Sequence, residues 1–194
     1  MTQFMAINPG VEVSGSTVLS FMNSMEQGRE TRKKILKNHG IDPDPKVWYK
    51  QQAWLNAYKE VYDSLGQMNL FLIGKAVIKN AEFPPMKNLE EALHSINIAY
   101  HMNHRLNGKI MFNPEDGSFT PGIGHYKLEQ YDAKQRKAVV VCRNPYPSKF
   151  DEGILTQLVR TFKPQDSVSQ KITLDETKET RRNGGSSCTF LIQW

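Results

Sequence analysis

The sequence predicts an α+β fold in which helices of the N-terminal half pack on a small antiparallel sheet formed by the C-terminal half. Segments with the 3.6-residue period of an amphipathic helix gather before residue 105, whereas most segments with a two-residue period follow Gly108. This segregation favours α+β over a doubly wound parallel sheet. A length of 194 residues, with 39% hydrophobic and 23% charged residues, is typical of one globular domain, which we expect to cover residues 1–194.

The first half carries five helical signals after an extended lead-in, which we expect over residues 1–13. The segment at 69–81 is apolar around nearly its whole circumference, and such a helix is expected to be buried. The last segment bears a core stripe that ends at Tyr100. In chain order, the helices are one capped by Ser14 or Ser16, a basic helix at 29–39, and helices at 51–66, 69–81 and 89–105.

The second half is expected to contain short strands and one more helix. The spacing of Ser148 and Asp151 predicts a capping box that starts a helix ending near Phe162. A final strand, Cys188–Trp194, alternates apolar and polar residues after a glycine turn and buries its last tryptophan. The other strands are expected as a hairpin formed by 123–131 and 137–143, a weak strand at 109–112, and a further strand within 167–174.

The composition favours a cytosolic, non-enzymatic protein. The sequence has two cysteines, no signal peptide and no apolar run of the roughly 18 residues that a membrane helix needs. Cys142 and Cys188 are therefore expected to be free thiols packed in the core. We find no dinucleotide fingerprint, P-loop or nucleophile elbow, so we do not expect an enzyme. The net charge of +5 permits an anionic partner without requiring one.

Three histidines on the helix at 89–105 raise the question of a metal or haem. His94, His101 and His104 are seven and three residues apart, whereas a metal pair on a helix normally uses a spacing of four. We therefore expect no metal site. Neutral imidazole also suits a haem ligand or a contact to an organic ligand, and these readings stay open beside a purely structural one.

The aromatic and apolar material of the middle helices suggests an internal ligand pocket. We place this pocket between the helices at 68–80 and 89–104 and the hairpin, although a solidly packed core would give the same pattern. Hydrophobic contact would supply the binding energy, and histidines and tyrosines would orient a polar group. The expected ligand-binding residues are Phe71, Tyr100, His101, His104 and Tyr126.

Several stretches also resemble a superfamily of bacterial ligand-binding domains. They are IGHY, VCRNPYPSKFDEGI and RRNGGSSCTFLIQW, with HGIDPDPKVWYKQQAWLNAYKEVYDSLG, IGKAV and AYHMNHR earlier in the chain. The resemblance covers about residues 39–194 and is to the group that includes 4-vinyl-reductase domains, haem-nitric-oxide-binding domains and TRAPP transport subunits. The part of the resemblance that carries over best to the whole group is the closing turn and strand with Gly184, Gly185 and Cys188.

The resemblance implies helices packed on an antiparallel sheet, often in a homodimer, around a hydrophobic ligand, and commonly a sensory role. Two features depart from it. The Y-x-S-x-R signature that grips haem propionates is missing, and Ser148 stands where the bacterial relatives would have a cysteine. No haem ligand follows from a motif, although His101 or His104 could be imagined in that role. Ser148 is then expected to serve as the helix cap.

The leading hypothesis is a non-catalytic sensory domain that binds a hydrophobic small molecule and forms a homodimer. The second is a haem-based gas or redox sensor. The third is an interaction module, whose basic helix at 29–39 would contact an acidic protein or nucleic acid together with Lys178, Arg181 and Arg182. Nucleic acid is the least expected of these partners.

Overall fold

A computed structural model describes residues 3–24 and 26–194 and confirms the α+β fold class. Within these residues six α-helices combine with two small antiparallel sheets. In chain order the elements are β1 (Val11–Ser14), α1 (Gly15–Met22), α2 (Arg29–Asn38), β2 (Trp48–Lys50), α3 (Gln51–Leu65), α4 (Gln67–Lys79), α5 (Leu89–Met102), β3 (His104–Leu106), β4 (Lys109–Ile110), β5 (His125–Asp132), β6 (Lys137–Arg143), α6 (Ser148–Phe162), β7 (Lys171–Leu174), the 3-10 turn η1 (Arg181–Asn183) and β8 (Cys188–Gln193).

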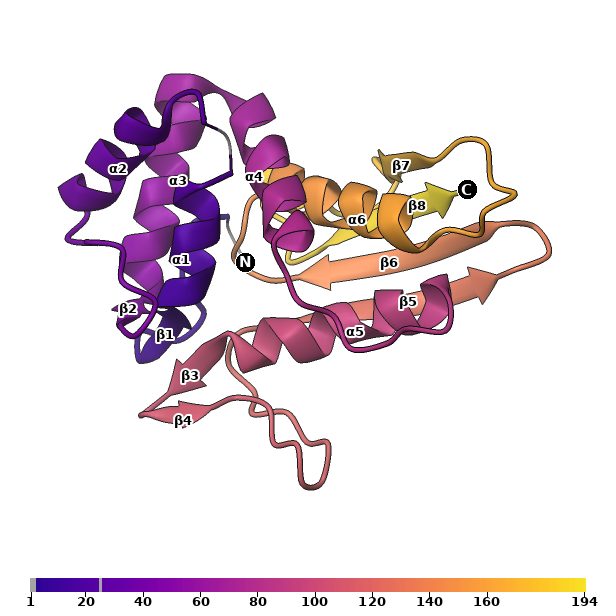
Figure 1. Cartoon of the computed structure of the whole chain (residues 1–194), viewed down its shortest axis with the longest axis horizontal. Helices are drawn as coiled ribbons and strands as arrows, with labels where there is room; N and C mark the ends of the chain where they lie inside the picture. The colour runs from indigo at the N-terminus through magenta and orange to yellow at the C-terminus, as the bar shows by residue number, and fades with distance from the viewer. Residues whose placement is uncertain (1–2, 25) are drawn as a thin grey trace.

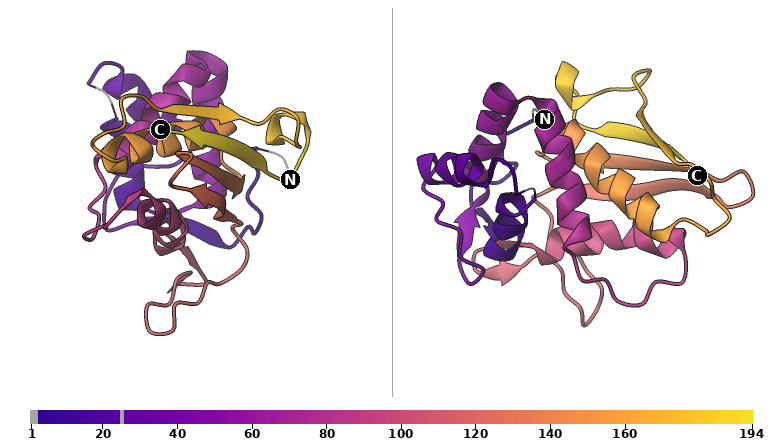
Figure 2. Two further views of the ribbon diagram at one scale, coloured as in Figure 1. Left: turned by 90° about the vertical axis from the view of Figure 1, so that its right-hand side faces the viewer. Right: turned by 45° about the horizontal axis from the view of Figure 1, so that its top comes forward.

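The larger sheet is formed by the C-terminal half, as the sequence predicts. Its strand order is β5-β6-β8-β7, with all neighbours antiparallel. Alternate residues of β6 are buried, and Cys142 lies directly opposite Cys188 of β8 in the register. Figures 1 and 2 show α5 and α6 along the same side of this sheet, which explains why only one of its faces is fully buried. The terminal Trp194 is buried and stacks on Tyr131 at 5.2 Å.

The smaller sheet, in the order β2-β1-β3-β4, was not predicted as a sheet, although the weak strand expected at 109–112 is present as β4. Its strands have two to four residues, too few to show a two-residue period. β1 lies in the expected lead-in, and the expected helix at 89–105 ends at Met102, so that His104 belongs to a strand. Pairing of His104 with Val13 of β1 holds that histidine against the first helices.

Helices α4 and α6 cross with their backbones in contact. A Cβ atom on Gly74 would lie 2.2 Å from the Phe150 carbonyl oxygen, and one on Gly153 would lie 2.1 Å from that of Phe71. Figure 1 shows α4 between the α1–α3 group and α6. Leu70 and Ile73 of α4 are fully buried, whereas Leu72, Val77 and Ile78 are only partly buried. The expected burial of this helix on all sides is therefore wrong, and Phe71 is only half-buried.

The capping box predicted for α6 is not formed. Pro147 occupies the N-cap position, and no side chain caps the helix. The Ser148 hydroxyl instead accepts a hydrogen bond from Arg182 Nε at 3.0 Å. Asp151 is fully buried, where it meets Arg181. The capping role assigned to Ser148 is thus wrong, because Asp151, the acidic residue of the predicted capping box, is buried and paired with Arg181. None of the described helices is both long and apolar enough to span a lipid bilayer.

Candidate functional site

Four of the five predicted ligand-binding residues come together at the C-terminal end of α5. We call this group the α5 cluster; it consists of Tyr100, His101, His104, Tyr126 and Tyr146. The Tyr100 ring is at its centre, with ring centroids of His104 at 4.7 Å and Tyr126 at 5.2 Å. The Tyr100 hydroxyl donates to the Ile123 carbonyl at 2.7 Å. The cluster therefore joins α5, β3, β5 and the turn after β6.

Phe71 does not belong to this cluster. Its ring lies 5.8 Å from the ammonium groups of Lys75 and Lys149, on the flank of α4. Phe71 is half-buried at this position, and its backbone carbonyl meets Gly153 of α6. Its ligand-binding role, like that of the other four residues, stays a prediction.

His104 is a buried, neutral histidine with both ring nitrogens engaged. Its Nδ1 lies 2.7 Å from the Tyr100 carbonyl oxygen and its Nε2 lies 2.8 Å from the Tyr146 hydroxyl. A carbonyl only accepts, so Nδ1 carries the proton and Nε2 accepts the hydroxyl proton of Tyr146. Burial lowers the pKa of His104 to about 4. The imidazole therefore has no nitrogen left for another partner.

His101 lies at the edge of the same cluster. Its Nδ1 is 2.8 Å from the Asn97 carbonyl oxygen, and its ring centroid is 4.7 Å from that of Phe119. Burial lowers the pKa of His101 as well. Phe119 belongs to a loop and is itself 41% exposed, so His101 is separated from solvent on that side by a single loop side chain.

A second group of buried polar side chains adjoins Tyr146 and was not predicted. Gln51, Trp54 and Tyr58 of α3 are all fully buried. Within residues 3–24 and 26–194, the amide atoms of Gln51, Trp54 Nε1 and the Tyr58 hydroxyl lack a hydrogen bond of good geometry. The side chains of Gln51 and Trp54 nevertheless approach the Tyr146 hydroxyl, and their weak hydrogen bonds oppose the rise that burial causes in its pKa. An unpaired buried polar group costs about 1–3 kcal/mol, so this concentration is unusual. We call Gln51, Trp54, Tyr58 and Tyr146 the polar core.

The polar core had a weak signal in the sequence. Gln51 lies three and four residues before Trp54 and Leu55, which places it on the apolar stripe of its helix. A polar residue on such a stripe is expected to be buried. A polar residue at the start of a helix is also typical of an exposed position, so the sequence alone does not single out Gln51.

Asp151 and Arg181 form a buried ion pair next to the α5 cluster. Both side chains are fully inaccessible, and the guanidinium also donates to the Asn144 carbonyl at 2.6 Å. The Tyr126 hydroxyl donates to Asp151 Oδ1 at 2.6 Å. Burial is the largest single influence and lowers the pKa of Arg181, but the charge and hydrogen bond of Asp151, together with the nearby thiols of Cys188 and Cys142, raise this pKa overall. Arg181 therefore cannot contact nucleic acid at the surface, and that assignment is wrong.

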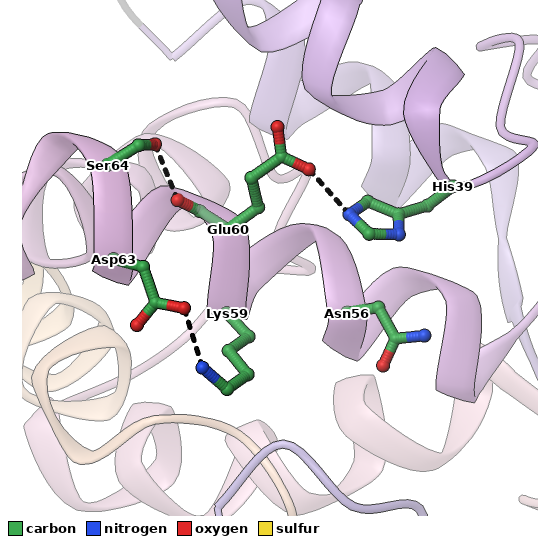
Figure 3. A pocket seen from close by; sticks show the side chains of 6 residues that line it. All are labelled: His39, Asn56, Lys59, Glu60, Asp63 and Ser64. Atoms are coloured by element: carbon green, nitrogen blue, oxygen red, sulfur yellow. Dashed lines mark hydrogen bonds and ion pairs between the residues drawn. The ribbon is translucent and has the colours of Figure 1, made fainter.

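Two hollows of the described residues lie elsewhere. One, of about 410 Å³, lies on the surface of α3 and is lined by polar residues around an ion pair of His39 and Glu60 at 2.7 Å (Figure 3). Another, of about 330 Å³, lies beside β7 and Arg182. Neither is lined by a member of the α5 cluster. The expected hollow beside Tyr100 and Phe71 is thus not one of them.

The part of the chain that the structure describes also places no three His, Cys, Asp or Glu residues around a metal position.

The fold has clear counterparts among solved structures. No protein-family model and no curated protein matches the sequence. An unliganded Fe(II) H-NOX protein from K. algicida aligns with a TM-score of 0.59 at 18% identity, covering 93% of this chain and 95% of that one. An oxygen-binding H-NOX domain related to soluble guanylate cyclases gives 0.59 at 14% identity, with 93% and 94% covered. The H-NOX from Shewanella woodyi gives 0.56 at 15% identity, with 92% and 93% covered.

These structures support the haem-nitric-oxide-binding part of the resemblance, while the link to 4-vinyl-reductase and TRAPP proteins stays a prediction. At such identities the likeness concerns the fold. The chain is thus similar, over nearly its whole length, to domains with the H-NOX fold.

Proposed function

We propose that this chain is a non-catalytic sensory domain that responds to a small molecule. The proposal is supported by the H-NOX-like fold and by the buried groups that this fold brings together. A sensor needs an interior whose packing changes with its occupant, and the α5 cluster connects elements from both halves of the chain.

The structural neighbours favour a haem-based gas sensor over a domain for a general hydrophobic ligand. They comprise an unliganded Fe(II) state, an oxygen complex and an Fe(II)CO state. The Shewanella woodyi domain also binds a second small molecule, IWP-051. The first question is therefore whether the side chains of this chain could hold a haem.

The side chains of the α5 cluster do not fit a haem as they are arranged. A haem-ligating histidine must offer a ring nitrogen to iron, and both nitrogens of His104 are hydrogen-bonded inside the protein. His101 is the remaining candidate in this cluster, but its ring lies against Phe119. The Tyr100 ring makes T-shaped contacts with the rings of His104, Tyr126 and Tyr146, and these contacts would have to open for a flat macrocycle to lie beside it.

The geometry therefore best supports a sensor that works without haem. The observation that carries this conclusion is the engagement of both His104 nitrogens inside a filled aromatic cluster. The ligand of such a domain has to be small, because the interior around Tyr100 and Tyr146 leaves room only between neighbouring side chains.

Reconstitution with haem tests this conclusion directly. The purified chain is mixed with haem, and the absorption spectrum is recorded after unbound haem is removed; we expect no Soret band. A band that corresponds to one haem per chain, lost in His101→Ala and kept in the matched control His94→Ala, would instead establish the haem-based gas sensor. His94 is a suitable control because it lies on the same helix and is exposed.

A further inference from the structure

One face of the larger sheet is turned away from α5 and α6, which lie along its other side (Figures 1 and 2). Residues directly opposite each other in an antiparallel sheet share a face. Ala138 and its partner Ile192 are buried on the helix side, so Val139 and its partner Leu191 face away from the helices. We call this second side the open face; it includes Lys137, Val139, Val141, Arg143, Lys171 and Leu191.

The centre of the open face is apolar. Val139 of β6 lies directly opposite Leu191 of β8, and Val141 is the next residue of β6 on the same side. Leu191 is 44% exposed, and both valines are only partly buried. The solvent side of an antiparallel sheet is normally polar, so an apolar strip over its two central strands indicates a surface that a partner covers.

Cations lie at both ends of this apolar strip. Lys137 and Lys171 lie opposite Gln193 from its two sides, so they are two strand spacings apart, about 10 Å. Arg143 is at the other end of β6, about 20 Å from Lys137 along the strand. All three cations are exposed, and none of them forms an ion pair within residues 3–24 and 26–194.

The two acidic side chains of β5 do not cancel this positive charge. Glu129 is already paired with Lys127 at 2.8 Å. Asp132 lies opposite Lys137 in the register, whereas Arg143 at the other end faces His125, which supplies no negative charge. The open face therefore carries more positive than negative charge.

We propose that the open face docks an amphipathic helix of a partner protein, with acidic residues at both ends of the apolar stripe of that helix. The inference rests on the proposed sensory function, because a non-catalytic sensor has to pass on its state through contact with a partner. Strand β5 links the two sides of the sheet: Tyr126 of the α5 cluster is on the buried side, and its neighbours His125 and Lys127 are on the open face. A rearrangement of the cluster therefore reaches the docked partner through one strand.

A helix matches the dimensions and the chemistry of this surface. The roughly 20 Å between the two cationic ends corresponds to about 13 helical residues. A helix packed there would cover the second side of the sheet as α5 and α6 cover the first. Glutamate or aspartate at its ends would meet the exposed cations, while its apolar side chains would cover Val139 and Leu191.

Two other occupants fit this surface less well. Within the described strands β5, β6, β7 and β8, the open-face positions hold no Phe, Tyr or Trp on which the bases of a nucleic acid could stack. A second copy of this chain would bring its own cations against Lys137, Lys171 and Arg143, and repulsion between like charges opposes that contact.

Binding of a designed peptide tests the surface. The probe is a fluorescein-labelled peptide of about 14 residues, with leucines along one helical face and glutamates at both ends of that face. We expect a saturable rise in its fluorescence anisotropy when the full chain is added at low salt. Lys137→Glu combined with Lys171→Glu should weaken this binding by about tenfold or more, and Leu191→Ser should weaken it by about fivefold.

Matched controls separate this surface from general charge attraction. Lys34→Glu combined with Lys37→Glu reverses two exposed cations on α2 and changes the net charge equally, so the affinity should stay nearly unchanged. A peptide with lysines in place of the glutamates should not bind. The docking surface is overturned by a lack of saturable binding, by an equal loss in the α2 variant, or by equal binding of the lysine peptide.

Two further measurements would reveal a different occupant, and either result would overturn the proposal. One is a DNA duplex that displaces the peptide and loses affinity in the Lys137→Glu, Lys171→Glu variant. The other is a dimer in analytical ultracentrifugation that dissociates in Leu191→Ser. The haem spectrum is an independent readout: a Soret band would overturn the haem-free function and leave this surface intact, whereas a failure of peptide binding would overturn only this surface.

Discussion

Acid destabilisation should report on His104, because this residue is neutral when folded and titrates freely when unfolded. Burial lowers its pKa from 6.5 to about 4. Between these values the unfolded chain binds a proton at this position and the folded chain does not, so stability falls as the pH falls. The contribution is fully present above the unfolded pKa and is lost progressively toward the folded one.

The size of this effect follows from the two pKa values. At about pH 4.5 the difference corresponds to about 2.5 kcal/mol of lost stability relative to neutral pH. This is a large share of the total for a domain of this size. His104→Gln removes the titrating group, so the variant should lose less stability on acidification, even though it is less stable at neutral pH.

The measurement is urea unfolding of wild type and variant at about pH 7.5 and pH 4.5, followed by far-UV circular dichroism. The wild type should lose about 2.5 kcal/mol more than His104→Gln over this range. His94→Gln serves as the control, because His94 is exposed and lies on α5, the helix that precedes His104. If His104→Gln and wild type lose stability in parallel, His104 is not a buried neutral group and the tautomer assigned to it is wrong.

Three further substitutions test the packing. Gly153→Ala would place a methyl group against the Phe71 carbonyl and should destabilise by about 3 kcal/mol or more in urea unfolding, whereas wild-type stability would mean that α4 and α6 lie farther apart. Asp151→Asn leaves Arg181 charged and buried and should cost about 3–5 kcal/mol in the same assay; a loss below about 1 kcal/mol would mean that the pair is solvated. Tyr58→Phe removes a hydroxyl without a partner and should leave the thermal midpoint unchanged or higher, and a clear drop would reveal a hydrogen bond at this hydroxyl.

The larger sheet and the helices that pack on it could be predicted, because each of their segments is long enough to repeat its hydrophobic spacing several times. Strand β6 and helix α6 each carry several repeats of a two- or four-residue spacing. The smaller sheet could not be predicted from spacing, because β4 has only two residues and only one residue separates β3 from α5. The helical pattern of α5 continues in sequence to His104, but the chain turns at Asn103, and no periodic signal marks that turn.

Part of the candidate site could also be predicted from the hydrophobic spacing of the sequence. Tyr100 and Tyr126 lie on stripes that the sequence shows, and the fold brings them together. Phe71 was misplaced, because the pattern cannot tell that Gly74 and Gly153 bring two backbones into contact and fix which side of α4 faces inward. The pairing of Asp151 with Arg181 joins residues far apart in sequence, which spacing alone does not reveal.

Native mass spectrometry of the full chain, purified from cells that produce haem, tests the central claim most directly. The account predicts no species heavier than the chain by the mass of haem, because both His104 nitrogens are used within the protein and its neighbouring rings are in contact. A haem adduct that survives in wild type and His94→Ala but disappears in His101→Ala would contradict it.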